Sequence, residues 1–404
     1  MVDTVDIIKR MDRTLLCIQG PPGTGKTYTT AHAIVELLKA GKRIGVTANS
    51  HKAVLNVLKS VKEILKTEKA TFDVVKIGGE SDDPVIEKHD IKFAQNSAAA
   101  ETFVNEDSIV IGGTAWVFSR PGLQQKFDYL FVDEAGQFSL ANVVATGCSA
   151  KNIVLVGDQM QLSQPTQGAH PGDSGKSALE YYLEGRQTIP EEKGVLLNTT
   201  WRMHPDICDY ISNAFYESRL QSRAENSKQR IDWKSKRARF TSKSHGIEFV
   251  SVEHDGNTQG SEEEVEAVAK IYKQLLKQGF VDNQGKKHEK LSDEDILVVA
   301  PFNLQVRMLK EKLGRKARVG TVDKFQGQEA QVVIISMASS SLEESPRGTA
   351  FLLEPNRLNV AVSRARALAV VVANRQIMLP RYGTIRDMEF ANRFCRLVHE
   401  AQNG

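Results

Sequence analysis

The eight residues GPPGTGKT, numbered 20–27, constrain the fold of this chain more than any other stretch. They follow an apolar run at 14–19 that is typical of a strand, and they open a segment at 27–40 with the apolar spacing of a helix. The pattern GxxxxGK[ST] between a strand and a helix indicates a phosphate-binding loop, in which backbone N–H groups surround phosphate oxygens. In this context a mere glycine-rich turn is the weaker interpretation.

The residue types in this loop suit a nucleoside triphosphate with Mg²⁺. Lys26 would place a positive charge at the β- and γ-phosphates, and the hydroxyl of Thr27 would ligate the metal ion. The N-terminus of the following helix adds a dipole that favours an anion. The other residues expected to contact the nucleotide are Gly20, Pro21, Pro22, Gly23, Thr24, Gly25 and Tyr28.

Apolar strands alternate with amphipathic helices along the whole chain. In the first half we predict strands at 43–48, 107–114, 127–133 and 152–158 and a helix at 51–65. In the second half we predict strands at 246–252, 295–301, 317–322, 330–337 and 367–374 and helices at 261–278, 302–313 and 355–365. This alternation predicts an α/β fold of two tandem domains, 1–198 and 199–404, each a mainly parallel sheet covered by helices.

Composition narrows the class of protein. The 404 residues are 41% hydrophobic and 25% charged, which is ordinary for a globular chain, and their net charge of +3 leaves any nucleic-acid surface to a local patch. No run of about 18 apolar residues predicts a membrane span, and no signal peptide is evident. Four scattered cysteines suggest neither disulfides nor a zinc site. We therefore expect a protein of a reducing compartment, cytoplasmic or nuclear.

Two acids end the strand predicted at 127–133. Beside a phosphate loop, Asp133 suits a Mg²⁺ ligand and Glu134 suits a base that polarises the attacking water. Gln137 could orient that water or sense the γ-phosphate. Alternatively, the acids could simply cap the next helix, but the phosphate loop favours the catalytic interpretation.

A second predicted strand, at 152–158, also ends in an acid. Asp158 and the nearby Gln161 are expected at the same edge of the sheet as Asp133, where ligands bind in such sheets. A plain strand-to-loop turn is the alternative.

The second half carries polar residues next to its own predicted strands. Arg202 precedes a helix, Glu329 precedes a strand, and Arg364 and Arg366 precede another. These arginines could be ordinary surface residues in ion pairs. If the edge of the second domain faces the phosphate loop, they could instead stabilise transition-state charge on a γ-phosphate.

One segment departs in composition. Residues 218–246 are strongly basic and include Trp233 and Phe240. The segment could be a solvated loop, or it could contact phosphates and stack an aromatic ring or two on bases.

The order of these motifs resembles the superfamily 1 helicases, in the branch of the nonsense-mediated-decay RNA helicase and senataxin. The resemblance runs from about 12 to 376 and rests on GPPGTGKT, TANSHKAV, VIGGTAW, VDEAGQ, VGDQMQL, WRMHP, TVDKFQGQE and RLNVAVSRAR. It implies two RecA-like domains with ATP in the cleft between them, and ATP and Mg²⁺ as cofactors. It also implies an enzyme that hydrolyses ATP to move 5′ to 3′ along single-stranded DNA or RNA and unwind duplex.

The resemblance also implies roles for individual residues. Arg202 and Arg366 would be arginine fingers with Arg364 close by, and Gln161 would couple the γ-phosphate to nucleic acid. Glu329 would contact the ribose or the nucleotide edge. Trp201, where the family usually has Tyr, would lie against the adenine. Nucleic acid would be contacted by Asn49, Ser50, His51, Thr114, Pro301, Gln305 and Thr321.

Two departures from the family pattern set limits. His51 stands where the nonsense-mediated-decay helicase has Asn, and the adenine-reading Gln has no clear counterpart near the start of the chain. The start also suggests a longer parent protein with accessory domains upstream. An ATP-gated clamp that binds and releases nucleic acid without unwinding is therefore the alternative function. A small-molecule kinase would leave the arginines of the second half unused.

Overall fold

The computed structural model describes residues 2–164, 168, 170–234, 240–343, 345, 348–379 and 384–403. Contacts divide the chain into two compact units. Unit 1 comprises Met1–Pro21, Gly25–Gln159 and Ser163–Leu197, and unit 2 comprises Pro22–Thr24, Met160–Leu162 and Asn198–Gly404. The tip of the glycine-rich loop therefore groups with unit 2, although the strand and helix on either side of it belong to unit 1.

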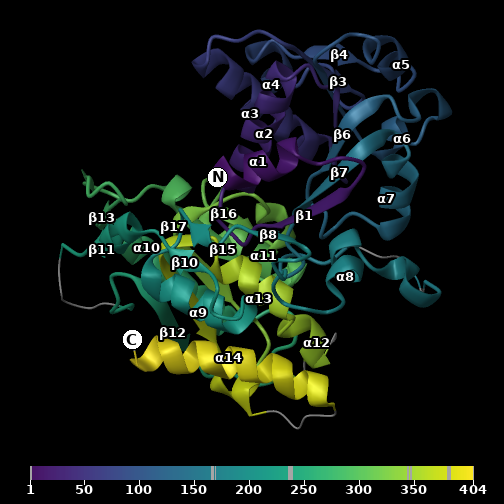
Figure 1. Cartoon of the computed structure of the whole chain (residues 1–404). Helices are drawn as coiled ribbons and strands as arrows, with labels where there is room; N and C mark the ends of the chain where they lie inside the picture. Colours follow the sequence, from purple (N-terminus) through teal and green to yellow (C-terminus); the bar gives the residue numbers. More distant parts are fainter. Residues whose placement is uncertain are drawn as a thin grey trace. The chain divides into compact units, whose positions relative to one another are not determined.

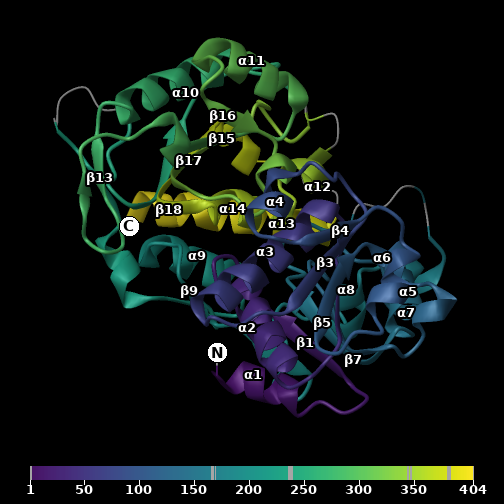
Figure 2. The same ribbon diagram turned by 90° about the horizontal axis from the view of Figure 1, so that it is seen from above.

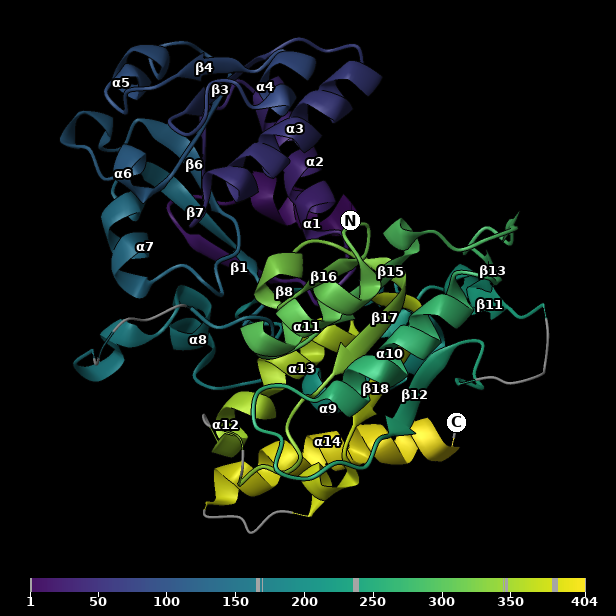
Figure 3. The same ribbon diagram turned by 180° about the vertical axis from the view of Figure 1, so that it is seen from behind.

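Unit 1 is built on one sheet in the order β4-β3-β5-β2-β6-β7-β1-β8, and its pairings are parallel. The strands are β1 (Leu15–Gln19), β2 (Ile44–Thr47), β3 (Asp73–Ile77), β4 (Lys92–Ala94), β5 (Ile109–Gly113), β6 (Phe127–Val132), β7 (Ala150–Gly157) and β8 (Gly194–Leu196). Figure 3 shows β3 and β4 side by side at one end of this sheet. Because all strands run the same way, their carboxyl ends meet at one edge.

Helices cover both faces of this sheet, because successive side chains of a strand point to opposite sides. Val110 packs on the face covered by α1 (Val2–Lys9), α2 (Lys26–Lys39), α3 (His51–Thr67) and α4 (Pro84–Lys88). Ile109 and Ile111 pack on the other face, which is covered by α5 (Ala99–Phe103), α6 (Ala115–Phe118), α7 (Leu140–Gly147) and α8 (Ala178–Leu183). Figure 1 shows α2 and α7 on opposite sides of the strands.

Unit 2 has a five-stranded parallel sheet in the order β12-β18-β17-β15-β16. Its strands are β12 (Gly246–Ser251), β15 (Ile296–Val299), β16 (Arg318–Gly320), β17 (Ala330–Ser336) and β18 (Ala365–Ala373). Two smaller sheets join β9 (Thr199–Thr200) with β10 (Gln221–Ser222), and β11 (Arg230–Asp232) with β13 (Gly279–Val281) and β14 (Lys287–His288).

The helices of unit 2 also form two layers. One face of its sheet packs against α10 (Glu262–Leu275) and α11 (Asn303–Leu313). The other packs against α9 (Pro205–Phe215), α12 (Gly348–Leu352), α13 (Pro355–Val362) and α14 (Ile385–Asn403). Figure 2 shows α10 and α11 on one side of β15 to β18 and α14 on the other.

The predicted fold class is confirmed, since both units are helix-covered parallel sheets. β3 and α14, however, were not predicted from the sequence. β3 is short and carries a buried lysine, which breaks the apolar run that marks other strands. α14 has a polar composition, and its buried residues form a single stripe at helical spacing, at Phe390, Ala391, Phe394, Leu397, Val398 and Ala401.

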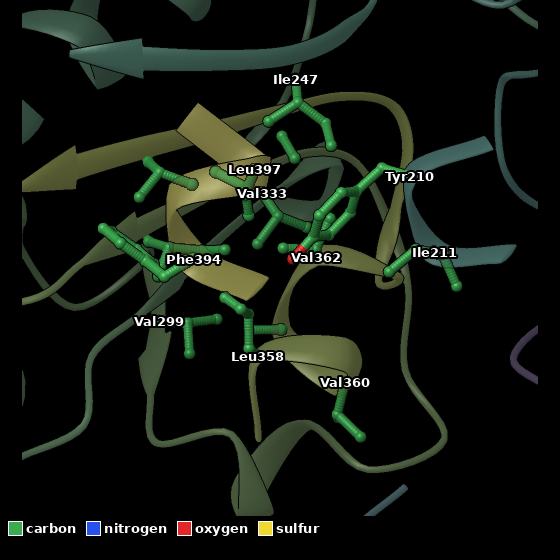
Figure 4. Close-up of a cluster of buried hydrophobic side chains, with 14 of the residues drawn as sticks. Tyr210, Ile211, Ile247, Val299, Val333, Leu358, Val360, Val362, Phe394 and Leu397 are labelled. Atoms are coloured by element: carbon green, nitrogen blue, oxygen red, sulfur yellow. The ribbon is translucent and has the colours of Figure 1, made fainter. Parts of the chain in front are cut away.

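We expect α14 to be essential to the core of unit 2. Phe394 is fully buried, and Figure 4 shows it with Leu397 among Tyr210 of α9, Val333 of β17 and Leu358 of α13. Phe394→Ala should lower the free energy of unfolding of unit 2 by about 3–5 kcal/mol in urea denaturation, because it leaves a cavity. Met388 lies on the same helix and is 53% exposed. Met388→Ala is therefore the matched control and should change the free energy of unfolding by less than about 0.5 kcal/mol.

Candidate nucleotide and nucleic-acid sites

The phosphate loop lies between the end of β1 and the start of α2. Gly25 caps α2 in a left-handed conformation with φ of 81°, which glycine adopts without strain. The N–H of Gly20 donates to the carbonyl of Gly157 over 2.9 Å, so the loop starts against the end of β7. The Lys26 ammonium donates to the carbonyl of Gly20, which folds the lysine back over the loop. Thr27 is half-buried in the first turn of α2, and Tyr28 is 55% exposed.

Pro22–Thr24 form the tip of the loop and pack within unit 2. The hydroxyl of Thr200 donates to the carbonyl of Pro22 over 3.0 Å, and the N–H of Trp201 donates to that of Gly23 over 2.9 Å. The indole ring of Trp201 is 55% exposed, and the guanidinium of Arg223 lies 4.0 Å from the ring centroid. Trp201, the residue expected against adenine, is thus held next to the loop tip by a backbone hydrogen bond.

Asp133 follows directly after β6 and is buried. Its N–H donates to the carbonyl of Thr47 over 2.8 Å, so the residue is fixed between β6 and β2. Burial and the nearby charge of Glu134 both raise the pKa of its carboxyl, the charge of Lys26 partly offsets them, and the resulting pKa is about 7. A buried carboxylate with this pKa needs a cation to stay charged at neutral pH. The oxygens of Asp133 and Thr27 are the hard donors that Mg²⁺ prefers, so the residues present fit this ion.

Glu134 begins a tight turn that is held by glycines. Its φ is 52°, in the left-handed region that is strained for this residue type. A Cβ on Gly136 would lie 2.6 Å from the carbonyl oxygen of Asp158, and one on Gly157 would lie 2.7 Å from the N–H nitrogen of Ala135. Only glycines therefore allow the ends of β6 and β7 to approach this closely. The half-buried Gln137 follows, and its N–H donates to the carbonyl of Glu134 over 2.8 Å.

Asp158 directly follows β7 at the same edge of the unit 1 sheet. It is 3% exposed, and the side-chain amide of Gln19 donates to it over 3.5 Å and to the carbonyl of Gln187 over 2.9 Å. Gln161 belongs to a short segment that groups with unit 2 and is half-buried. The order of strands places β7 between β1 and β6, so the loop, Asp158 and Asp133 follow one another along the edge.

In unit 2, Arg202 and Arg366 share one carboxylate. Both guanidinium groups donate to Glu329, with 2.9 Å from Nε of Arg366 to Oε1, and Nη1 of Arg202 also donates to the carbonyl of Ser363 over 3.0 Å. Burial would raise the pKa of Glu329, but the charges of the two arginines outweigh it and lower the pKa below its usual value. The neighbouring Arg364 is 3% exposed, so its side chain is part of the interior.

Three residues predicted to contact nucleic acid lie where β2 leads into α3, and Thr114 follows the neighbouring strand β5. Thr47 and Gly113 pair in register, so both loops leave the sheet at one edge. The hydroxyl of Ser50 caps α3 by accepting from the N–H of Ala53 over 3.1 Å, and the side-chain amide of Asn49 donates to the carbonyl of Gln137. His51 is the exposed first residue of α3.

Trp116 is a candidate contact that was not predicted from the sequence. Its side chain is 82% exposed, two residues beyond Thr114 in the first turn of α6. An exposed aromatic ring beside a predicted binding loop is a stacking surface that suits any base. The motif VIGGTAW contained this signal, but exposure cannot be read from the motif.

In unit 2, Pro301 and Thr321 lie together and Gln305 does not join them. β15 and β16 pair side by side, and Pro301 and Thr321 after them line one small apolar cavity of about 40 Å³. Gln305 is fully buried instead. Its amide donates to the hydroxyl of Ser336 over 2.8 Å and accepts from the N–H of Ser261 over 2.9 Å. The prediction that Gln305 contacts nucleic acid is therefore wrong for this structure, because its polar atoms link α10, α11 and β17.

The basic segment 218–246 is described only in part, and its residues 235–239 lie outside the described residues. Trp233 packs against the core under α10, and its indole N–H donates to the carbonyl of Lys243 over 3.2 Å. Phe240 is 51% exposed. Of the two aromatic residues in the segment, only Phe240 thus offers an accessible ring.

Within the described part of the chain, no helix has the length and apolar character to cross a membrane.

Comparison with known proteins gives family matches over both units. One family model, described as an AAA domain, matches residues 175–376, and a second with the same description matches 4–167. A "Regulator of nonsense transcripts 1 homolog" from Drosophila melanogaster is 27% identical, over 91% of this chain and 34% of its own length. A "DNA polymerase alpha-associated DNA helicase A" from Schizosaccharomyces pombe is 27% identical, over 90% of this chain and 61% of its own.

A third relative, "DNA replication ATP-dependent helicase/nuclease JHS1" from Arabidopsis thaliana, is 25% identical over 89% of this chain and 27% of its own length. The chain spans 34% and 36% of the first two curated relatives it matches. The alignments therefore cover both units, whereas most of the length of the first two relatives lies outside the aligned part.

The raised pKa of Asp133 makes a prediction about stability and pH. The folded state binds this proton more tightly than the unfolded chain, whose carboxyl has a pKa near 3.8, so ionised Asp133 destabilises the metal-free fold above about pH 7. Asp133→Asn should therefore raise the stability of the metal-free protein at pH 8 by about 2–4 kcal/mol. The gain should shrink as pH falls from about 7 towards 4. Thermal unfolding in a chelator measures it.

Asp128 on the same strand is the matched control. Burial would raise its pKa, but bonds from the N–H of Arg43 and the ammonium of Lys151 outweigh burial and lower it. Its charge stabilises the fold above its unfolded pKa, so Asp128→Asn should reduce stability at pH 8. Equal effects of both variants at all pH values would contradict this assignment.

Proposed function

Because this chain belongs to the AAA-domain family, in the superfamily 1 helicase branch of the nonsense-mediated-decay helicase, we propose that it is an ATP-driven helicase. It would hydrolyse ATP, move 5′ to 3′ along single-stranded DNA or RNA, and separate duplex. The observation that carries the proposal is the meeting of the phosphate loop, Asp133 and Glu134 at one edge of the unit 1 sheet.

The residues of unit 1 would divide the work at the γ-phosphate. The N–H groups of Gly20–Gly25 and the ammonium of Lys26 would hold the phosphates, and Thr27 and Asp133 would hold Mg²⁺. When bound, the ion would neutralise charge on phosphate oxygens. Glu134, placed after the buried Asp133 by a turn with little freedom, would accept the proton of the attacking water. Gln137 would orient that water.

The residues of unit 2 would supply positive charge. We propose Arg202 and Arg366 as arginine fingers, and their present bonds to Glu329 support this role by holding both guanidinium groups together. A γ-phosphate would replace Glu329 as the partner of at least one of them. Glu329 would then be free to contact the ribose or the nucleotide edge, and Trp201 would stack on adenine. Gln161 would couple the phosphate to bound nucleic acid, and Arg364 would support the fingers from the interior.

A single strand would be held by loops at the carboxyl ends of strands in each unit. In unit 1 the contacts would be Asn49, Ser50, His51 and Thr114, with the exposed ring of Trp116 for base stacking. In unit 2 they would be Pro301 and Thr321. Both DNA and RNA remain substrates of this proposal, since relatives are named for DNA replication and for the control of transcripts.

An ATP-gated clamp that grips nucleic acid without unwinding is the second candidate. The observation that favours it is that the residues described above are assigned to ATP hydrolysis and to holding a single strand, and none of them is assigned to the separation of strands.

Strand separation distinguishes the two functions. Duplexes of DNA and of RNA with a 5′ or a 3′ overhang should be unwound only when ATP and Mg²⁺ are present, and only from the 5′ overhang. The matched control is Glu134→Gln, which should bind ATP as the wild type does and unwind nothing, because the base is lost. ATP hydrolysis without strand separation would favour the clamp, and near wild-type hydrolysis by Glu134→Gln would refute the assigned base.

A further inference from the structure

A buried lysine lies in β3, the second strand from one end of the unit 1 sheet. Lys76 is 2% exposed, and β3, which carries it, has β4 on one side and β5 on the other. Its neighbours Val75 and Ile77 point to the face of α5 to α8, so Lys76 points to the face of α3. Burial lowers the pKa of its ammonium to about 8. Lysine is rarely buried without a specific partner.

Lys76 has three acceptors for its three N–H groups. Its Nζ lies 2.8 Å from the carbonyl oxygen of Ile77, 2.6 Å from that of Gly78 and 2.9 Å from Nδ1 of His51. An ammonium group can donate but not accept, so Nδ1 of His51 must be the acceptor. A neutral imidazole that accepts at Nδ1 carries its proton on Nε2. The contact therefore selects one of the two tautomers of His51.

The loop after β3 holds the imidazole ring in place. Gly78 and Gly79 have φ of 70° and 95°, and a Cβ on either would lie 3.1 Å from the ring of His51. The two glycines thus let the backbone pack against the ring. Burial lowers the pKa of His51 and the charge of Lys76 lowers it further, so the imidazole is neutral near pH 7. His51 as a whole is nevertheless exposed.

We propose that Lys76 is a positioning residue for nucleic-acid binding, which holds His51 so that its Nε2–H donates to a backbone phosphate of a single strand at the start of α3. This inference rests on the proposed binding of nucleic acid, and it adds a residue that does not itself touch the strand. The site would recognise a phosphodiester of either DNA or RNA, because one N–H donor to a phosphate oxygen carries no information on base or sugar.

The surroundings of His51 favour a phosphate. α3 is 17 residues long and starts at His51, so its N-terminal N–H groups and dipole attract an anion. Ser50 already satisfies one N–H of the first turn, and Lys52 is exposed next to His51. The Nε2–H of a neutral His51 would add a directional hydrogen bond to this general electrostatic attraction of a phosphate. A protonated His51 would add charge, but the ammonium of Lys76 opposes that form.

A double-mutant cycle tests whether Lys76 acts through His51. Binding of a fluorescent single-stranded oligonucleotide is measured by anisotropy for the wild type, Lys76→Met, His51→Ala and the double variant. Each single substitution should weaken binding about tenfold, the effect of losing one hydrogen bond to a charged group. The double variant should bind no more weakly than His51→Ala alone. If the losses of affinity in the two single variants instead multiplied in the double variant, the inference would be overturned and Lys76 would be a structural residue.

A matched control removes the same charge nearby. Lys92 on the adjacent strand β4 is exposed and pairs with Asp73 over 2.5 Å. Lys92→Met should leave binding close to the wild-type value. A loss as large as that of Lys76→Met would show an effect of net charge only and overturn the inference. Lys76→Arg, which keeps a donor, should restore part of the affinity.

Imidazole tautomers give a readout that needs no binding. In protein labelled with ¹⁵N-histidine, the resonances of His51, assigned with His51→Ala, should show a protonated Nε2 and a bare Nδ1 at pH 7. Lys76→Met should raise the pKa of His51, because the positive charge of Lys76 disfavours protonation of the imidazole and is lost in this variant. A protonated Nδ1 in the wild type would overturn the inference. If the wild type bound no single strand while Nε2 was protonated, the proposed function would fail and the Lys76–His51 contact would stand.

Discussion

The buried carboxyl of Asp133 is the constraint on which the rest of unit 1 depends. It is held between β6 and β2 by a backbone bond, it adjoins the charge of Glu134, and the positive group that acts on its pKa is Lys26 of the phosphate loop. Such a carboxyl is tolerated when a cation joins it. The glycines at 136 and 157 let the backbone after β6 pack closely against the end of β7, next to the left-handed Glu134.

In unit 2 the pKa of the central acid, Glu329, is shifted in the opposite direction from that of Asp133. Glu329 is also partly buried, but two guanidinium groups lower its pKa, so it stays ionised without a metal ion. The backbone strengthens this cluster, since Arg202 also bonds to Ser363 and the N–H of His204 donates to the carbonyl of Arg366 over 2.8 Å. Unit 1 therefore holds an acid whose pKa is raised, and unit 2 holds an acid that two arginines keep ionised. Ionisable groups with shifted pKa values are common at functional sites, which supports the proposed ATP hydrolysis.

Local patterns in the sequence were sufficient for the parallel sheets and for the order of the motifs. As predicted from the sequence, the loop at 20–27 lies between β1 and α2, and Asp133 and Asp158 directly follow β6 and β7. These features could be predicted because strand ends and glycine turns depend on residues that are close in the sequence. Contacts between distant residues were not predictable in this way. Gln305 looked like a surface residue, yet Ser261 and Ser336 bury its amide. Lys76 looked like a break in an apolar run, yet it reaches His51, which lies 25 residues earlier.

We propose that a phosphate site in unit 1 is coupled to a single strand bound at the loops that follow its strands. The most direct measurement is the rate of ATP hydrolysis by the wild-type protein with Mg²⁺, with and without single-stranded oligonucleotides of DNA and RNA. We predict slow hydrolysis by the protein alone and a severalfold increase with at least one kind of strand. A rate that no strand changes would contradict the central claim, because the ATP site would then work without the nucleic acid it is proposed to move.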